Sequence, residues 1–164
     1  DKEQVVSSNG QLFYPFQGDE KPARSILLID NDIDWGNYLR MELSSKYNVE
    51  ICNDPQKAWK SIISTMPDAV LTDILLPNID GITICKKIKE NPETNFIPVI
   101  ILSSLTDEDS ERMCFSAGAD HFITKPTSLD LLKSTIDQAI QTRVTLRNRF
   151  RADLKYDFDN IIYP

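Results

Sequence analysis

The chain has 164 residues, of which 41% are apolar, so it is long and apolar enough for one folded domain with a full core. Its formal charge is −7, from 25 acidic and 18 basic residues, which argues against a nucleic-acid footprint over the whole surface. The cysteines have no CxxC spacing and His121 is the only histidine, so the ligands of a zinc site are missing. We expect Cys52, Cys85 and Cys114 to be reduced, buried side chains.

Residues 1–23 are polar, contain glycine and proline and show no periodicity, which predicts a linker. No apolar run approaches the ~20 residues of a membrane-spanning helix, so we expect this fragment to make no membrane contact. The chain begins at Asp1 rather than at Met, and we expect it to be part of a longer protein, although a processed terminus would look the same.

From Ser25 onward, short apolar runs alternate with amphipathic stretches. The first, third and fourth runs are almost continuously apolar, which suits parallel strands covered on both faces. The predicted strands are 25–29, 48–52, 69–72, 98–102 and 120–123. The predicted helices are 33–46, 55–65, 81–90, 107–117 and 128–148. Strict alternation of strands and helices predicts an α/β fold with one parallel sheet and right-handed crossovers.

Capping residues support the predicted helix starts. Asp54-Pro55 is an N-cap followed by a first-turn proline, Asp80-Gly81 precedes the third helix, and Ser128 can cap the fifth. The last helix is expected to run beyond the domain through the basic segment 142–151, either as a connection to a following domain or as a solvated helix end. We interpret 156–164 as part of such a connection.

Four polar side chains follow predicted strands directly. Asp30, Asp73, Ser103 and Lys125 come after the first, third, fourth and fifth strands. In parallel sheets ligands bind outside the carboxyl ends of the strands, so these four are expected to meet. Each one alone could be a capping, turn or solvated residue. Together they predict a site for a divalent metal and a phosphoryl group, in which a carboxylate could act as nucleophile toward phosphorus.

The same motifs give the chain a close resemblance to the response-regulator receiver domains of two-component signalling. The resemblance covers about residues 24–143 and rests on the order and spacing of four motifs, which lie at 26–32, 67–81, 98–104 and 118–126. It implies a flavodoxin-like, doubly wound fold with five parallel strands in the order 2-1-3-4-5.

The resemblance also implies roles for individual residues. Asp73 would accept the phosphoryl group from a histidine kinase, with Lys125 and Ser103 contacting it. Asp30, Asn31, Asp73 and the backbone carbonyl of Leu75 would hold Mg²⁺. Ser103 would form a switch pair with Phe122. The Lys125-Pro126 peptide is expected to be cis, a rare state even for X-Pro bonds. An isolated domain of this kind would not be an enzyme beyond accepting and losing the phosphoryl group.

The tail is similar to receivers of bacterial hybrid two-component systems, in which a histidine kinase, a receiver and a DNA-binding helix-turn-helix domain share one chain. By this resemblance, 1–23 is the linker, 24–143 the receiver, and 144–164 a helix extension toward an output domain. It implies a cytoplasmic location, leaves a homodimer open, and assigns transcription regulation to the output domain rather than nucleic-acid contact to this fragment.

Asn31 departs from the family pattern, which has a second acid at that position. The amide keeps an oxygen ligand but removes one negative charge, which predicts Mg²⁺ binding weaker by about 1–3 kcal/mol. Two alternatives stay open. The chain could be a degenerate receiver that acts as an interaction module without phosphorylation. It could also be a phosphatase of the haloacid-dehalogenase type, with Asp30 as nucleophile and Asp32 as acid, although Asp73 would then have no role.

Overall fold

The computed structural model describes residues 5–6, 12–13 and 24–162, with side chains described for 24–155. Two short strands, β1 (Val5–Val6) and β2 (Leu12–Phe13), pair antiparallel. The rest of the predicted linker 1–23 lies outside the described residues. No helix in the described part of the chain has the length and hydropathy needed to cross a bilayer.

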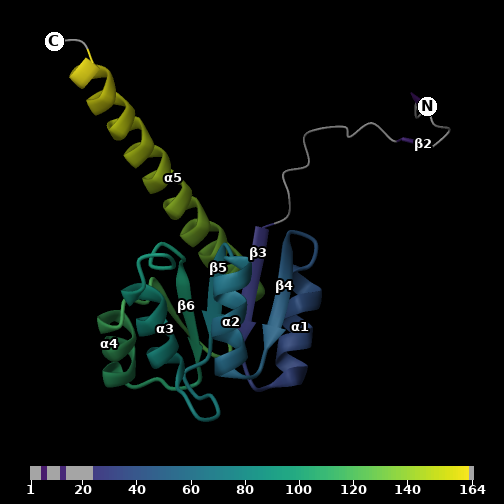
Figure 1. Cartoon of the computed structure of the whole chain (residues 1–164). Coiled ribbons are helices and arrows are strands. Elements are labelled where there is room, and N and C mark those ends of the chain that lie inside the picture. Colours follow the sequence, from purple (N-terminus) through teal and green to yellow (C-terminus); the bar gives the residue numbers. More distant parts are fainter. Residues whose placement is uncertain (1–4, 7–11, 14–23, 163–164) are drawn as a thin grey trace.

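The domain is built on a five-stranded parallel sheet (Figure 1). Its strands are β3 (Arg24–Ile29), β4 (Tyr47–Cys52), β5 (Ala69–Thr72), β6 (Val99–Ser103) and β7 (His121–Thr124). Their order is β4-β3-β5-β6-β7, so the predicted α/β fold and the order 2-1-3-4-5 are confirmed. All four residues of β5 and all five of β6 are buried, which explains their uninterrupted apolar sequences.

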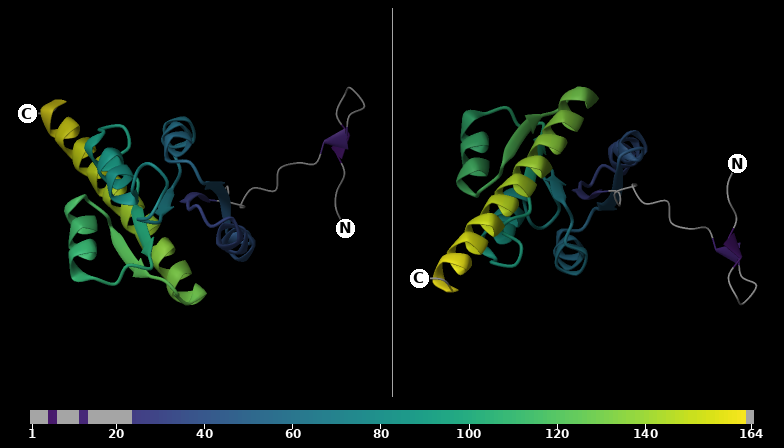
Figure 2. Two further views of the ribbon diagram at one scale, coloured as in Figure 1. Left: turned by 90° about the horizontal axis from the view of Figure 1, so that it is seen from below. Right: turned by 90° about the horizontal axis from the view of Figure 1, so that it is seen from above.

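Helices cover both faces of the sheet (Figure 2). The helices are α1 (Ile33–Leu43), α2 (Pro55–Thr65), α3 (Gly81–Glu90), α4 (Glu108–Ser116) and α5 (Leu129–Ile162). Leu39 of α1 and Ile136 of α5 belong to one core cluster, on one side of the sheet. Ile62 of α2, Ile88 of α3 and Cys114 of α4 belong to the other. Each sheet face therefore has its own apolar layer, as in other doubly wound folds.

The expected caps are in place. The Asp54 side chain accepts a hydrogen bond from the N–H of Gln56, and Asp80 accepts one from Thr83. Ser128 Oγ accepts a hydrogen bond from the N–H of Leu131 at 3.1 Å, in the first turn of α5. These local bonds satisfy N–H groups that a helix leaves without intrahelical partners, which is why the helix starts could be predicted.

The predicted end of the last helix is wrong. We expected 128–148, whereas α5 continues to Ile162 and rises well beyond the sheet (Figure 1). No glycine or proline occurs between Leu129 and Ile162, so nothing in the backbone interrupts the helix. The first helix, by contrast, ends at Leu43 rather than at residue 46. The other predicted elements agree within one residue.

All three cysteines are free, as predicted. Cys85 and Cys114 are buried, and burial raises the pKa of Cys85 to about 12 and that of Cys114 to about 11. Cys52 lies on the edge strand β4 and is only half-buried, so the prediction that it is buried was wrong.

Candidate functional site

The polar residues singled out in the sequence gather at the carboxyl edge of the sheet. The N–H of Asp73 donates to the carbonyl of Ile29 at 3.0 Å, which ties the end of β5 to the end of β3. The N–H of Lys125 donates to the carbonyl of Ser103 at 2.8 Å, which ties the end of β7 to the end of β6. The ladder that aligns the parallel strands thus also aligns the residues that follow them.

Lys125 joins the two acids. Its Nζ lies 2.8 Å from Asp30 Oδ2 and 3.0 Å from Asp73 Oδ2. Asp30 is 1% exposed and Asp73 is 8% exposed. Burial would lower the pKa of Lys125, but hydrogen bonds and charge attraction from both carboxylates outweigh burial and raise it. The ammonium is therefore charged at neutral pH. Two carboxylates and one cation leave the cluster with a net charge of −1.

The second oxygen of each carboxylate is held by backbone. Asp30 Oδ1 accepts from the N–H of Asp32 at 2.8 Å, and Asp73 Oδ1 accepts from the N–H of Leu75 at 3.2 Å. Asp32 turns its own side chain to the N–H of Trp35, at 3.0 Å, and caps α1. Asp32 is therefore a capping residue in this structure rather than a third acid of the site.

Trp35 also approaches the cluster, since its ring centroid lies 5.7 Å from Lys125 Nζ, within range of a cation–π interaction. This contact could not be predicted from the sequence, because Trp35 and Lys125 lie far apart along the chain.

Gly81 is a further residue whose role the sequence did not reveal beyond a helix start. A Cβ atom at this position would overlap the carbonyl oxygen of Asp73, so no other residue fits without displacing that backbone. The N–H of Gly81 donates to the carbonyl of Ile74 at 2.8 Å and closes the loop after β5. Asp80-Gly81 was the available signal, and it pointed only to a cap.

The predicted switch residues lie on the two neighbouring strands. Ser103 is fully buried, and its Oγ accepts from the N–H of Leu105 at 3.0 Å. Phe122 is half-buried and packs against the cluster that contains Ile101. The Lys125-Pro126 peptide is cis, as expected.

The oxygen donors at this edge suit a hard divalent cation. Each carboxylate oxygen of Asp30 and Asp73 has one protein donor and keeps a lone pair. Asn31, the residue after Asp30, is exposed. Mg²⁺ is usually bound by one or two carboxylates, waters and phosphate oxygens, so the residues fit this ion. Within the described residues, no three His, Cys, Asp or Glu side chains are grouped so that they could hold a metal ion.

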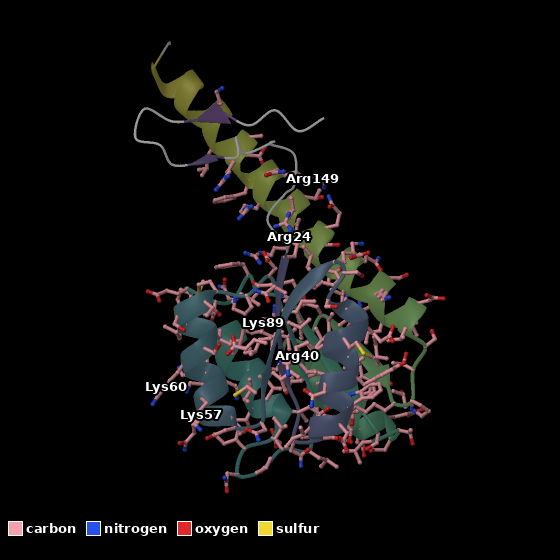
Figure 3. The ribbon with its side chains drawn as sticks, turned by 90° about the vertical axis from the view of Figure 1, so that its right-hand side faces the viewer. Arg24, Arg40, Lys57, Lys60, Lys89 and Arg149 are labelled. Carbon is pink, nitrogen blue, oxygen red and sulfur yellow. The ribbon has the colours of Figure 1, made fainter. Side chains whose placement is uncertain are left out.

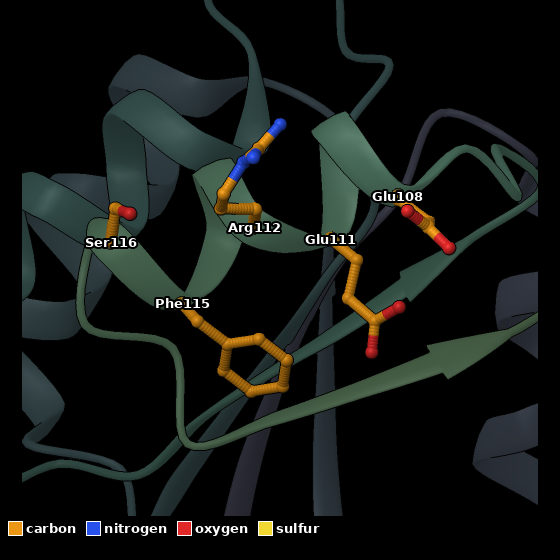
Figure 4. Close-up of a pocket in the computed structure, with 5 residues that line it drawn as sticks. All are labelled: Glu108, Glu111, Arg112, Phe115 and Ser116. Atoms are coloured by element: carbon orange, nitrogen blue, oxygen red, sulfur yellow. The ribbon is translucent and has the colours of Figure 1, made fainter.

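The pocket drawn in Figure 4 lies elsewhere, on the outer surface of α4. It is lined by Glu108, Glu111, Arg112, Phe115 and Ser116. None of the residues at the carboxyl edge lines it, so its shape carries no information about the cluster of Asp30, Asp73 and Lys125.

Comparison with known proteins agrees with this arrangement. The family described as the response regulator receiver domain matches residues 26–137. The response regulator MprA of Mycolicibacterium vanbaalenii is 34% identical over 126 residues, which are 76% of this chain and 52% of MprA. The chain spans only 17% to 52% of the lengths of RcaC from Microchaete diplosiphon, a probable cyclic di-GMP phosphodiesterase from Vibrio cholerae and MprA.

Solved structures show the same fold. The receiver domain of a signal transduction histidine kinase from Syntrophus aciditrophicus is 30% identical, with a TM-score of 0.69, and the alignment covers 73% of this chain and 92% of that one. The receiver domain of the histidine kinase PA1611 from Pseudomonas aeruginosa is 24% identical, with a TM-score of 0.68, and the alignment covers 73% of this chain and 99% of that domain. That structure has a magnesium ion coordinated in its active-site cleft. The chain therefore belongs to the response regulator receiver domain family.

Proposed function

We propose that this chain is a phospho-accepting receiver in which Asp73 takes a phosphoryl group from a phosphohistidine of a histidine kinase. The observation that carries the proposal is the Lys125 ammonium, 2.8 Å from Asp30 and 3.0 Å from Asp73 at the sheet edge where ligands bind in such folds. A structural ion pair of one acid and one base is neutral. Two buried acids that share one cation instead keep one negative charge, which a divalent cation could neutralise.

In the transfer, an oxygen of the Asp73 carboxylate attacks phosphorus and the P–N bond of the phosphohistidine breaks. The imidazole leaves as a neutral group after taking up a proton, and an aspartyl phosphate results. Lys125 neutralises charge on the phosphoryl oxygens, and the Ser103 hydroxyl donates to one of them. Transfer of this kind depends mainly on positioning and on charge stabilisation. Water later attacks phosphorus, the P–O bond to Asp73 breaks, and inorganic phosphate leaves as the carboxylate is regenerated.

Mg²⁺, when bound, supplies further neutralisation of the phosphoryl charge. Asp30, Asn31, Asp73 and the Leu75 carbonyl are the residues that would hold it. The magnesium ion in the active-site cleft of the PA1611 receiver supports the choice of Mg²⁺ as the bound cation. Because Asn31 brings no charge, we expect Mg²⁺ to bind about ten- to hundredfold more weakly than to the Asn31→Asp variant.

We place this receiver, residues 24–143, in a longer cytoplasmic chain with a histidine kinase before it and a DNA-binding output domain after it. Residues 1–23 would be the linker and 144–164 the connection, and phosphorylation would control transcription through that output domain. The helix that continues to Ile162 supports a connection of this kind, as do the longer relatives.

Labelling with a small radioactive phosphodonor and Mg²⁺ tests the acceptor. We expect the parent chain to be labelled and the Asp73→Asn variant to remain unlabelled. Asp68→Asn is the matched control, because it removes an aspartate at the opposite end of the same strand and should keep the label. Persistent labelling of Asp73→Asn would contradict the proposal.

The alternative is a receiver that binds partners without being phosphorylated. One observation favours it: residue 31 is an uncharged amide. A Mg²⁺ titration followed by Trp35 fluorescence separates the two functions. Saturation accompanied by labelling supports the acceptor. Failure to saturate, with labelling appearing only in Asn31→Asp, supports the interaction module.

A further inference from the structure

The outer half of α5 shows an apolar stripe to solvent. Leu146, Phe150 and Leu154 are spaced four residues apart and are 59%, 65% and 43% exposed. Residues at this spacing share one face of a helix. The helix from residue 144 to Ile162 is about 28 Å long and stands clear of the sheet in Figure 1. Helices in proteins gain most of their stability from packing of an amphipathic face, so this exposed apolar face is suited to a partner.

Charge divides this part of the helix into two segments. Residues 143–151 contain four arginines and no acid, whereas residues 152–160 contain three aspartates and one lysine. The basic segment lies next to the domain, where Figure 3 labels Arg149, and the acidic segment lies farther out. A partner that matches both segments must present its acidic end to the domain and its basic end to the tip.

A groove opens where α5 leaves the domain. It has a volume of about 870 Å³ and lies between α5 and the amino ends of β6 and β7. Phe96, 43% exposed, forms its floor with Leu146 and Phe150, and Arg143 stacks over the Phe96 ring at 4.6 Å. Arg147 lines the same groove. Lys89 and Asp120 also line it and pair with each other at 2.9 Å, so the margin keeps a net positive charge from Arg143 and Arg147. An apolar groove with this margin suits an acidic segment that carries apolar residues.

The outer segment of α5, residues 152–160, is itself acidic and carries apolar residues. We propose that two copies of the chain associate through α5 in an antiparallel pair, and that each copy places the outer end of its α5 in the groove of the other. A register that sets residue 150 level with residue 154 of the second copy also sets 146 level with 158, which is Phe in this sequence. The basic segment of each copy then lies along the acidic segment of the other. A parallel pair would set the arginine-rich segments side by side. The contact is two-fold symmetric and closes after two copies.

Sedimentation velocity of the unphosphorylated 164-residue chain tests the pairing, independently of the proposed phosphoryl transfer. We expect a reversible dimer, and at least tenfold weaker association for Phe150→Asp. Met113→Asp is the control, since Met113 is 57% exposed on α4 and lies outside the proposed contact. A monomeric parent chain would overturn the proposal. So would a dimer that Met113→Asp dissociates and Phe150→Asp does not. Unchanged thermal melting of both variants shows that they fold.

Spin labels separate the two orientations. A single label at the exposed position Gln141, in a Cys52→Ser background, should lie about 33 Å along the helix axis from its counterpart in the antiparallel pair. A label at Ala152, near the centre of the pair, should lie close to its counterpart in either orientation. A short distance at both positions would show a parallel pair and would overturn the proposed arrangement.

Discussion

Two clusters of charged side chains, at opposite edges of the central sheet, have opposite ratios of acids to bases. At the carboxyl edge, Asp30 and Asp73 share one cation, Lys125. At the amino edge, one acid, Asp68, is paired with two arginines, of which Arg24 lies at 3.5 Å and Arg143 at 3.8 Å from Asp68 Oδ1. Figure 3 shows Arg24 at this edge.

Under the proposed function, the cluster at the carboxyl edge is reactive and the cluster around Asp68 is structural. Asp68 is satisfied, because its other oxygen also accepts from the N–H of Ser25 at 2.8 Å, and the cluster holds α5 against the sheet through Arg143. The carboxyl edge keeps an excess negative charge that a divalent cation such as Mg²⁺ can neutralise. Strand β5 connects the two clusters, because its four buried residues lie between Asp68 and Asp73.

The largest expected effect concerns the space at the carboxyl edge. Gly81→Ala places a Cβ against the carbonyl oxygen of Asp73, so we expect the free energy of unfolding to fall by about 3 kcal/mol and labelling of Asp73 to be impaired. Gly36→Ala is the control, because its Cβ would meet only the side chain of Ile51, at 3.3 Å. Urea denaturation of both variants measures the difference, and equal stability would show that the loop after β5 adjusts freely.

Lys125→Met tests the excess charge itself. We expect the variant to lose about 2 kcal/mol of stability at neutral pH, because Asp30 and Asp73 are left buried without a cation. The pKa of Lys125 is raised in the folded state, so the contribution of its charge is present below the ordinary lysine value of 10.5 and is lost as the pH rises through the folded-state pKa. Urea denaturation at several pH values should therefore show a gap between the parent chain and the variant that narrows only in strong alkali.

The smallest expected changes in the free energy of unfolding should have opposite signs at the two edges of the sheet. Asp68→Asn leaves Arg24 and Arg143 without a counter-charge, and we expect a loss of about 1 kcal/mol. Asp73→Asn removes one of two neighbouring acids, and we expect a gain of about 0.5 kcal/mol. Thermal unfolding by circular dichroism compares them directly. Destabilisation of equal size at both positions would contradict the distinction between the edges.

Much of the carboxyl edge could be predicted because it depends on chain order. Asp30, Asp73, Ser103 and Lys125 follow apolar strands directly, and parallel strands bring their ends to one edge. The caps were predictable for a similar reason, since each bonds a group two or three residues away. What could not be predicted depends on approach between distant segments: the contact of Trp35 with Lys125 is an example.

The amino-acid sequence by itself determined the α/β order of elements, the residues at the strand ends and the charge division along α5, because periodicity and local order encode them. Only the tertiary structure decided that Lys125 bridges both acids, that Gly81 must lack a side chain, and that Arg143 ties α5 to Asp68. Each of these depends on distances across the sheet or between its layers, and such distances are set by packing rather than by position along the chain.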